Sequence, residues 1–152
     1  MSAQKILGVV GRRRFVTSGA CLVCAAWLGG CRGEGGSAIR GPVTIPLGPA
    51  TSFPLGATVR LVERVVVVRD EGGFGVMSLR CTHQDCLVTY GGEFEPVRCP
   101  CHGATFSPTG RVLSGPATID LPWYATAVTP LGGLEVTLGA VVPSSERFPW
   151  RG

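Results

Sequence analysis

The sequence predicts an all-β domain, and three observations support this prediction. Glycine and proline are frequent, with 23 and 12 residues in a chain of 152. Valine, which favours strands, outnumbers leucine in several apolar runs. Few stretches show the apolar periodicity of an amphipathic helix. Beyond its first thirty residues, the chain therefore has the pattern of short strands joined by turns, with length for one domain and its appendages.

Residues 1–30 have the composition of an export leader. Consecutive arginines followed by Phe15 and Val16 resemble a twin-arginine signal, which carries folded proteins across the bacterial inner membrane. The apolar residues 15–30 are fewer than the roughly 20 that span a bilayer comfortably. LGGC, ending at Cys31, resembles a lipobox, so we expect cleavage before Cys31 and lipidation of its sulfur. An uncleaved transmembrane anchor is the alternative, and both interpretations tether the domain on the periplasmic side, where disulfides persist.

Residues 31–49 are rich in glycine, serine and proline, and we expect them to form a flexible linker. The formal net charge of +4 comes from four basic residues before residue 15, because ten basic and ten acidic residues follow. A nearly neutral mature domain gives no indication of a nucleic-acid partner.

The predicted domain covers residues 50–142, followed by an irregular tail at residues 143–152. Two hairpins are expected, one with its turn at residues 70–73 and one closed by residues 91–93, and they end beside Cys81 and Cys99. A further turn with proline at its second position is expected at residues 107–110. The expected strands are residues 58–62, 65–69, 74–79, 87–90, 97–99, 104–106, 111–113, 119–121, 124–128 and 134–138.

Both histidines of the chain lie beside cysteines, in CTHQDC (residues 81–86) and CPCHGA (residues 99–104). Thiolate and imidazole are ligands of transition metals, so the two loops predict a metal site. A structural zinc site is one alternative, although zinc fingers usually space their paired cysteines by two to four residues. Another alternative is that the cysteines form only disulfides and the histidines lie on the surface. This requires the two cysteine–histidine motifs, called boxes below, to have arisen independently.

The two boxes resemble those of the Rieske iron–sulfur family, and the resemblance covers about residues 50–140. It implies one [2Fe-2S] cluster, with one iron held by Cys81 and Cys99 and the other by His83 and His102. Two thiolates and two sulfides leave an oxidised cluster neutral, so it accepts an electron more easily than a cluster with four thiolates. An imidazole on the iron also gains basicity on reduction, which couples a proton to the electron.

The extra cysteine in each box marks the disulfide-bearing branch of the family, found with quinol-oxidising complexes, and implies a Cys86–Cys101 bridge. The family fold is an antiparallel β-sandwich-like base with a smaller cluster-binding subdomain, here at about residues 80–111. Gly115-Pro116 resembles the proline loop that shields the cluster.

Two departures from the family pattern affect the expected chemistry. Ala104 and Phe106 stand where high-potential members carry serine and tyrosine hydroxyls, and each lost hydrogen bond lowers the potential by roughly 60–130 mV. We therefore expect a potential well below the family's upper limit of about +300 mV. Gln84 and Asp85 replace the apolar and small residues of the usual docking tip. A carboxylate beside the exposed histidines is costly to bury against an apolar pocket and is expected to attract a cationic partner instead.

The expected function is one-electron transfer by a membrane-tethered protein, from a quinol or enzyme donor to a cytochrome or cupredoxin-like acceptor. One alternative is the Rieske subunit of a quinol–cytochrome c oxidoreductase or of an arsenite-oxidase-like molybdenum complex. A third hypothesis is the ferredoxin of a ring-hydroxylating oxygenase, but the export leader and the extra pair of cysteines argue against it. A fourth hypothesis is a zinc-binding module without redox activity. No residue set for substrate binding or general base catalysis is visible, so we expect no independent turnover.

Overall fold

The computed structural model describes residues 41–151, and the predicted all-β fold is confirmed there. Nine strands and one short 3-10 helix make up its regular structure, and none of its helices is long and apolar enough to cross a membrane. The predicted leader at residues 1–30, Cys31 and the first part of the predicted linker lie outside the described residues. The elements are β1 (Val43–Pro49), η1 (Ala50–Ser52), β2 (Gly56–Arg60), β3 (Val65–Asp70), β4 (Gly73–Ser78), β5 (Val97–Arg98), β6 (Thr105–Phe106), β7 (Val112–Ser114), β8 (Trp123–Val128) and β9 (Gly133–Val142).

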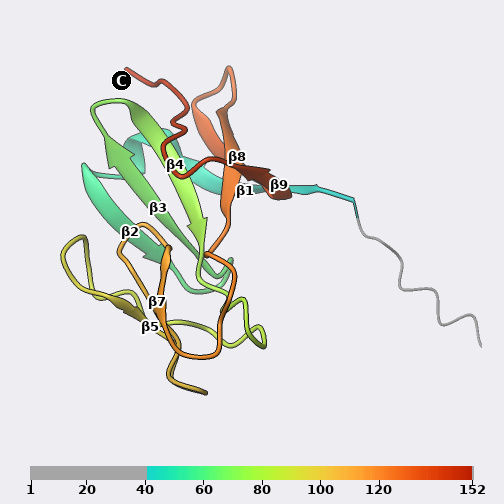
Figure 1. The fold of residues 1–152 in the computed structure, drawn as a ribbon. Helices are drawn as coiled ribbons and strands as arrows, with labels where there is room; N and C mark the ends of the chain where they lie inside the picture. The colour runs from blue at the N-terminus through green and yellow to red at the C-terminus, as the bar shows by residue number, and fades with distance from the viewer. Residues whose placement is uncertain (1–40, 152) are drawn as a thin grey trace, which may run out of the picture. The chain divides into compact units, whose positions relative to one another are not determined.

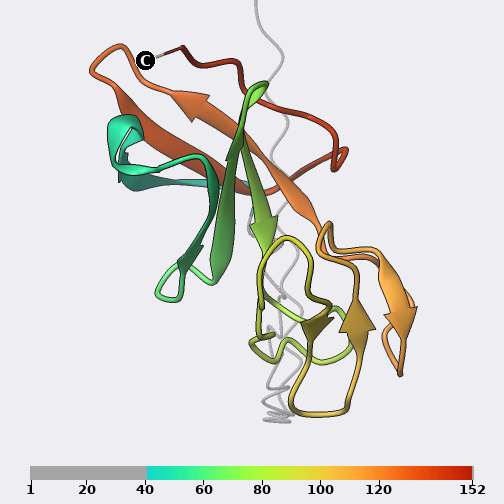
Figure 2. The ribbon, with the colours of Figure 1, turned by 90° about the vertical axis from the view of Figure 1, so that its left-hand side faces the viewer.

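The strands form two antiparallel sheets of unequal size. The larger has six strands in the order β1-β9-β8-β4-β3-β2, and the smaller has three in the order β5-β6-β7. Figures 1 and 2 show the small sheet, in yellow and orange, beyond one end of the strands of the large sheet. This is the predicted arrangement of an antiparallel base with a smaller subdomain, and the subdomain is inserted between β4 and β8.

The first predicted hairpin forms as expected, because four consecutive valines, which favour strands, lead into a tight turn. β3 pairs with β4 from Val65↔Ser78 to Asp70↔Gly73. Along β3 successive side chains point to opposite faces, so Val66 enters one core cluster while Val65 and Val67 enter the other. The first of these clusters also contains Cys81 and Cys99, so the predicted thiol ligands belong to the core beneath the small sheet.

The linker prediction was wrong for residues 43–49, which form β1. Alternating Val43, Ile45 and Leu47 supply a strand pattern that the neighbouring prolines obscure. Proline is compatible with an edge strand, and β1 lies at the edge of the large sheet with its register shifted between Pro46 and Gly48.

Three further strand predictions need correction. Residues 119–121 form no strand, because this segment is held by loop contacts, with Leu121 N–H donating to the Gly110 carbonyl at 2.8 Å. Residues 87–90 make only isolated bridges, and β9 is longer than expected. The tail is also less irregular than predicted, because Phe148 exchanges two backbone hydrogen bonds with Phe74 of β4.

The turn between β2 and β3 is held by Arg60 and Glu63, whose nearest side-chain atoms are 2.7 Å apart. This hydrogen bond with Arg60 is the main cause that lowers the pKa of Glu63 below its ordinary value of 4.5, against the opposing effect of burial. A lowered carboxyl pKa stabilises the fold above the unfolded pKa, and the stabilisation is lost as the pH falls through the folded pKa.

We predict that Glu63→Gln lowers the free energy of unfolding by less than about 1 kcal/mol at neutral pH. The difference from the unmodified chain should disappear at a pH well below 4.5, where the Glu63 carboxyl group is protonated and as neutral as the glutamine that replaces it. Chemical denaturation at several pH values measures this, with Glu71→Gln as the control, because Glu71 makes no ion pair with any residue in 41–151. A pH-independent deficit would contradict the assignment.

Candidate metal centre

Two loops of similar design present the predicted ligands. The first follows β4, and its backbone closes with hydrogen bonds from Cys81 N–H to the Cys86 carbonyl and from Asp85 N–H to the Cys81 carbonyl, both 2.8 Å long. The second follows β5, and Cys99 N–H donates to the Ala104 carbonyl at 2.8 Å while Gly103 N–H donates back to Cys99 at 3.1 Å. In each loop the first cysteine is therefore fixed at the base and the histidine lies in the turn beyond it.

The two free cysteines of the described region, Cys81 and Cys99, are both buried and only 3% exposed. Burial raises the pKa of the Cys81 thiol, and the neighbouring Cys99 raises it further. At Cys99 burial acts in the same direction, but the N–H groups of Cys101 and His102 and the Cys81 thiol outweigh it and lower the pKa. Both thiols thus lie in one core cluster, and their surroundings move their pKa values in opposite directions.

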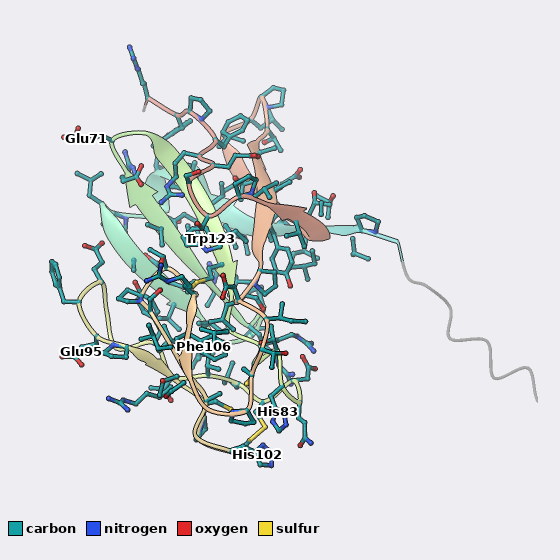
Figure 3. The ribbon with its side chains drawn as sticks, viewed as in Figure 1. Glu71, His83, Glu95, His102, Phe106 and Trp123 are labelled. Atoms are coloured by element: carbon teal, nitrogen blue, oxygen red, sulfur yellow. A yellow bond between two sulfur atoms is a disulfide. The ribbon has the colours of Figure 1, made fainter. Side chains whose placement is uncertain are left out.

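The two imidazoles also form a pair. The ring centroids of His83 and His102 are 4.9 Å apart and the rings are nearly perpendicular. Figure 3 shows both rings at the end of the subdomain farthest from Glu71. His102 is exposed and His83 is half-buried. The histidines therefore lie on the solvent side of the site and the cysteines on the core side.

One atom of this site has no partner within the part of the chain that the structure describes. His83 Nδ1 is buried and makes no hydrogen bond there. Leaving a buried polar group unsatisfied costs about 1–3 kcal/mol, so such an atom in a native site calls for a partner. A metal ion bound to Nδ1 supplies one, which makes the donor set of two thiols and two imidazoles fit the cluster that the sequence predicts.

The spacing of the predicted donors can be set against that of a tetrahedral zinc site. Zinc bonds of about 2.0–2.3 Å hold all four ligand atoms of a tetrahedral site within about 4 Å of one another. Among residues 41–151, the only group of three potential ligand atoms within 4.8 Å of one another is Cys86, Cys99 and Cys101. The predicted ligands do not form so compact a group there, since both thiols are buried in the core and the centroids of the two imidazole rings are 4.9 Å apart.

The predicted bridge between the loops is present. Cys86 and Cys101 form a disulfide with an S–S distance of 2.11 Å across a sequence separation of 15 residues. It joins the two ligand loops directly, so it holds the cysteine of one loop near the cysteine of the other.

We predict that Cys86→Ser leaves the cluster assembled but labile. Opening a loop of this length costs the folded state about 3 kcal/mol relative to the unfolded chain. The visible absorption of the purified protein should therefore disappear at lower temperature than in the unmodified chain, with iron content unchanged at the start. The double change Cys86→Ser with Cys101→Ser should behave in the same way. Unchanged thermal stability would show that the bridge has no stabilising role.

The hydroxyl groups near the second loop are engaged elsewhere. Thr105 Oγ1 and Ser114 Oγ are 2.6 Å apart, and Ser107 Oγ lies 2.9 Å from Thr109 Oγ1. Ala104 and Phe106 are fully buried, as part of the core cluster beneath the small sheet. Each of these hydroxyl groups thus already has a hydrogen-bond partner.

An ion pair at the tip was missed by the sequence analysis. Asp85 has a φ of 59° and its carboxylate accepts a hydrogen bond from Arg80, the residue before Cys81. The sequence offered a signal in two opposite charges on either side of one short loop, but their contact depends on this uncommon backbone conformation. The carboxylate that was expected to attract a cationic partner is therefore in contact with a cationic side chain of its own loop.

Comparison with known proteins points to one protein family. Residues 44–125 match the family model of the Rieske [2Fe-2S] domain. The chain is 33% identical over 88 residues to the cytochrome b6-f complex iron-sulfur subunit of Chlorobaculum tepidum, covering 55% of this chain and 48% of that protein. It is 36% identical over 58 residues to the corresponding subunit of Synechococcus elongatus, covering 38% and 32%. The chain thus spans half or less of the length of these relatives.

Among solved structures, the chain is similar to the cyanobacterial plasma membrane Rieske protein PetC3 from Synechocystis. The TM-score is 0.44 and the identity 33%, over 60% of this chain and 97% of that one.

Proposed function

Because the chain belongs to the Rieske [2Fe-2S] family, we propose that it is a membrane-tethered one-electron transfer protein whose single cluster is held by Cys81, Cys99, His83 and His102. The cofactor follows from the family, and the four ligands are our assignment. The observation that carries the assignment is the meeting of a buried thiol pair and an imidazole pair at one end of the subdomain. When bound, such a cluster accepts and releases one electron at a time.

The residues of the proposed site have different roles. Cys81 and Cys99 supply negative charge from within the core, where water is excluded. The exposed ring of His102 gives the shortest route to solvent, so a redox partner is expected to dock over the histidines. The Arg80–Asp85 ion pair removes net charge from this tip, which favours a partner surface that is itself nearly neutral at the point of contact.

Tethering is proposed from the sequence alone. The twin-arginine pattern of residues 1–30 and the lipobox ending at Cys31 support export to the periplasmic side and attachment through a lipid. Radiolabelled fatty acid supplied to the producing cells should enter the protein, and Cys31→Ala should abolish the incorporation and release the domain from membranes. Membrane retention of the variant without lipid would favour the transmembrane anchor instead.

Membership of a larger complex is the second candidate function. It is favoured by the similarity to cytochrome b6-f iron-sulfur subunits, whose names state such an assembly for those proteins. An arsenite-oxidase-like assembly is a further form of the same candidate, and a cytochrome or cupredoxin-like protein is the expected acceptor of a free carrier. Mild solubilisation of native membranes separates these possibilities, because a free carrier runs alone on a native gel and a subunit runs with its partners.

Reversible electron transfer is tested by protein-film voltammetry of the full chain. A single one-electron wave well below about +300 mV supports the proposal, because the hydroxyl donors of high-potential members are replaced by Ala104 and Phe106. A midpoint near that limit would contradict our explanation of the potential, and the absence of any wave from an iron-loaded protein would contradict the function itself.

We predict that Ala104→Ser raises the midpoint potential by roughly 60–130 mV, through a hydroxyl hydrogen bond that stabilises the reduced cluster. Ala125→Ser, at a half-buried alanine of β8, is the control and should leave the potential unchanged. If Ala104→Ser has no effect, Thr105 or Ser107 already supplies a donor despite the contacts that engage them here.

A further inference from the structure

The disulfide has a third sulfur atom beside it. The Sγ atoms of Cys86, Cys99 and Cys101 all lie within 4.8 Å of one another, and only the first and last are bonded. Cys99 is a free thiol. Cys81, the other free thiol of the described region, does not complete such a group with the two bonded sulfurs. Cys99 is therefore the thiol that the fold places against the bridge.

We propose that Cys99 exchanges with this disulfide whenever no metal is bound to its sulfur. A site that has lost its cluster then cannot bind a new one. The thiolate of Cys99 attacks the sulfur of Cys86 and forms a Cys86–Cys99 bond. The Cys86–Cys101 bond breaks, and Cys101 leaves as a thiolate that takes up the proton released by Cys99. The number of disulfides is unchanged, so the step needs no external oxidant or reductant.

The local structure selects Cys86 as the sulfur attacked. A bond from Cys99 to Cys101 would close a ring across a single residue, within the turn that Gly103 N–H and the Cys99 carbonyl already hold. Attack on Cys86 instead releases Cys101, which is exposed, so water stabilises the leaving thiolate. The new bond joins the same two loops as the old one, so it demands little movement of the backbone.

The exchange has a direct consequence for the site. Cys99 is one of the ligands in our proposed function, on which this consequence rests, and a sulfur bound in a disulfide cannot serve as a thiolate ligand. Bound metal occupies the attacking sulfur and so protects the native bridge. Loss of the metal exposes the bridge to its neighbour, and only a thiol reductant then restores the site.

The test uses the full chain, first loaded with its cluster and then freed of iron by a chelator in the absence of thiols and oxygen. Free thiols are trapped by alkylation in acid, and the protein is digested with trypsin without reduction. Cleavage after Arg80, Arg98 and Arg111 yields the linked peptides 81–98 and 99–111. Fragmentation of this pair shows which cysteines are bonded and whether Cys99 or Cys101 carries the alkyl label.

We expect the loaded protein to contain only the Cys86–Cys101 link and the iron-free protein to contain the Cys86–Cys99 link with labelled Cys101. Reloading with iron and sulfide should fail until a thiol reductant is added. Finding only the Cys86–Cys101 link in the iron-free protein would overturn the proposal, and so would a link from Cys99 to Cys81 or to Cys101. Iron content of the unmodified chain tests the proposed function separately.

Two variants form a matched pair, because each lacks one proposed thiol ligand and is purified without a cluster. Cys81→Ser keeps the attacking sulfur and should show the Cys86–Cys99 link. Cys99→Ser removes the attacking sulfur and should retain the Cys86–Cys101 link alone. The same disulfide map in both variants would contradict the role of Cys99.

Discussion

Cys99→Ser is expected to abolish the cluster completely. The side chain is 3% exposed and belongs to the same buried core cluster as Cys81. A serine hydroxyl is not deprotonated at neutral pH and is a poor ligand for iron, so one iron would be left with a single protein ligand. The purified variant should be colourless, with iron at background and no EPR signal after reduction.

Cys86→Ser is the matched control for this loss, because it changes another cysteine of the same sulfur group without removing a proposed ligand. It should retain iron and colour when freshly purified. A Cys99→Ser protein that keeps its full iron content and spectrum would refute the ligand assignment, whereas equal loss in both variants would show that the disulfide is needed for assembly.

Gly115→Ala is expected to cause the second large effect, on stability. Gly115 has a φ of 89°, and a Cβ atom there would lie 2.6 Å from Ala104 Cα and 3.0 Å from the Gly103 carbonyl oxygen. The left-handed backbone costs a non-glycine residue about 1–2 kcal/mol, and overpacking against backbone adds about 1–3 kcal/mol. The segment that begins at Gly115 must then move away from the second ligand loop.

We therefore expect Gly115→Ala to lower the free energy of unfolding by about 2–5 kcal/mol and to speed the loss of the cluster. Gly132→Ala isolates the backbone cost, because Gly132 has a φ of 82° and a Cβ atom added there would meet nothing within 4 Å. Thermal unfolding followed by circular dichroism and visible absorption measures both variants. Equal destabilisation by the two changes would show that the close approach to Ala104 adds nothing to the loss of free energy of unfolding.

The sequence predicted those parts of the fold that depend on local pattern. The β3–β4 hairpin follows from a run of valines before a tight turn. The motifs around His83 and His102 combine cysteine and histidine at a spacing that few other sites share. The Cys86–Cys101 bridge followed from the resemblance. Each of these features depends on residues that are close together in the chain or on a specific motif.

Features that depend on distant segments could not be predicted in this way. β1 was hidden by its prolines, and only its pairing with β9 shows that they are compatible with an edge strand. The pairing of Phe148 with Phe74 depends on the path of the tail over the sheet. Two features of the site depend instead on loop conformation: the burial of His83 Nδ1, which has no hydrogen-bond partner among residues 41–151, and the contact between Arg80 and Asp85.

The most direct test of the account is pulsed EPR of the reduced protein made with isotope-labelled histidine. We predict two inequivalent histidine nitrogens strongly coupled to the unpaired electron, because His83 and His102 are the only histidines in the chain. A cluster with no coupled histidine nitrogen, or a colourless protein that contains zinc, would contradict the claim that this pair of imidazoles and a pair of thiolates hold two irons.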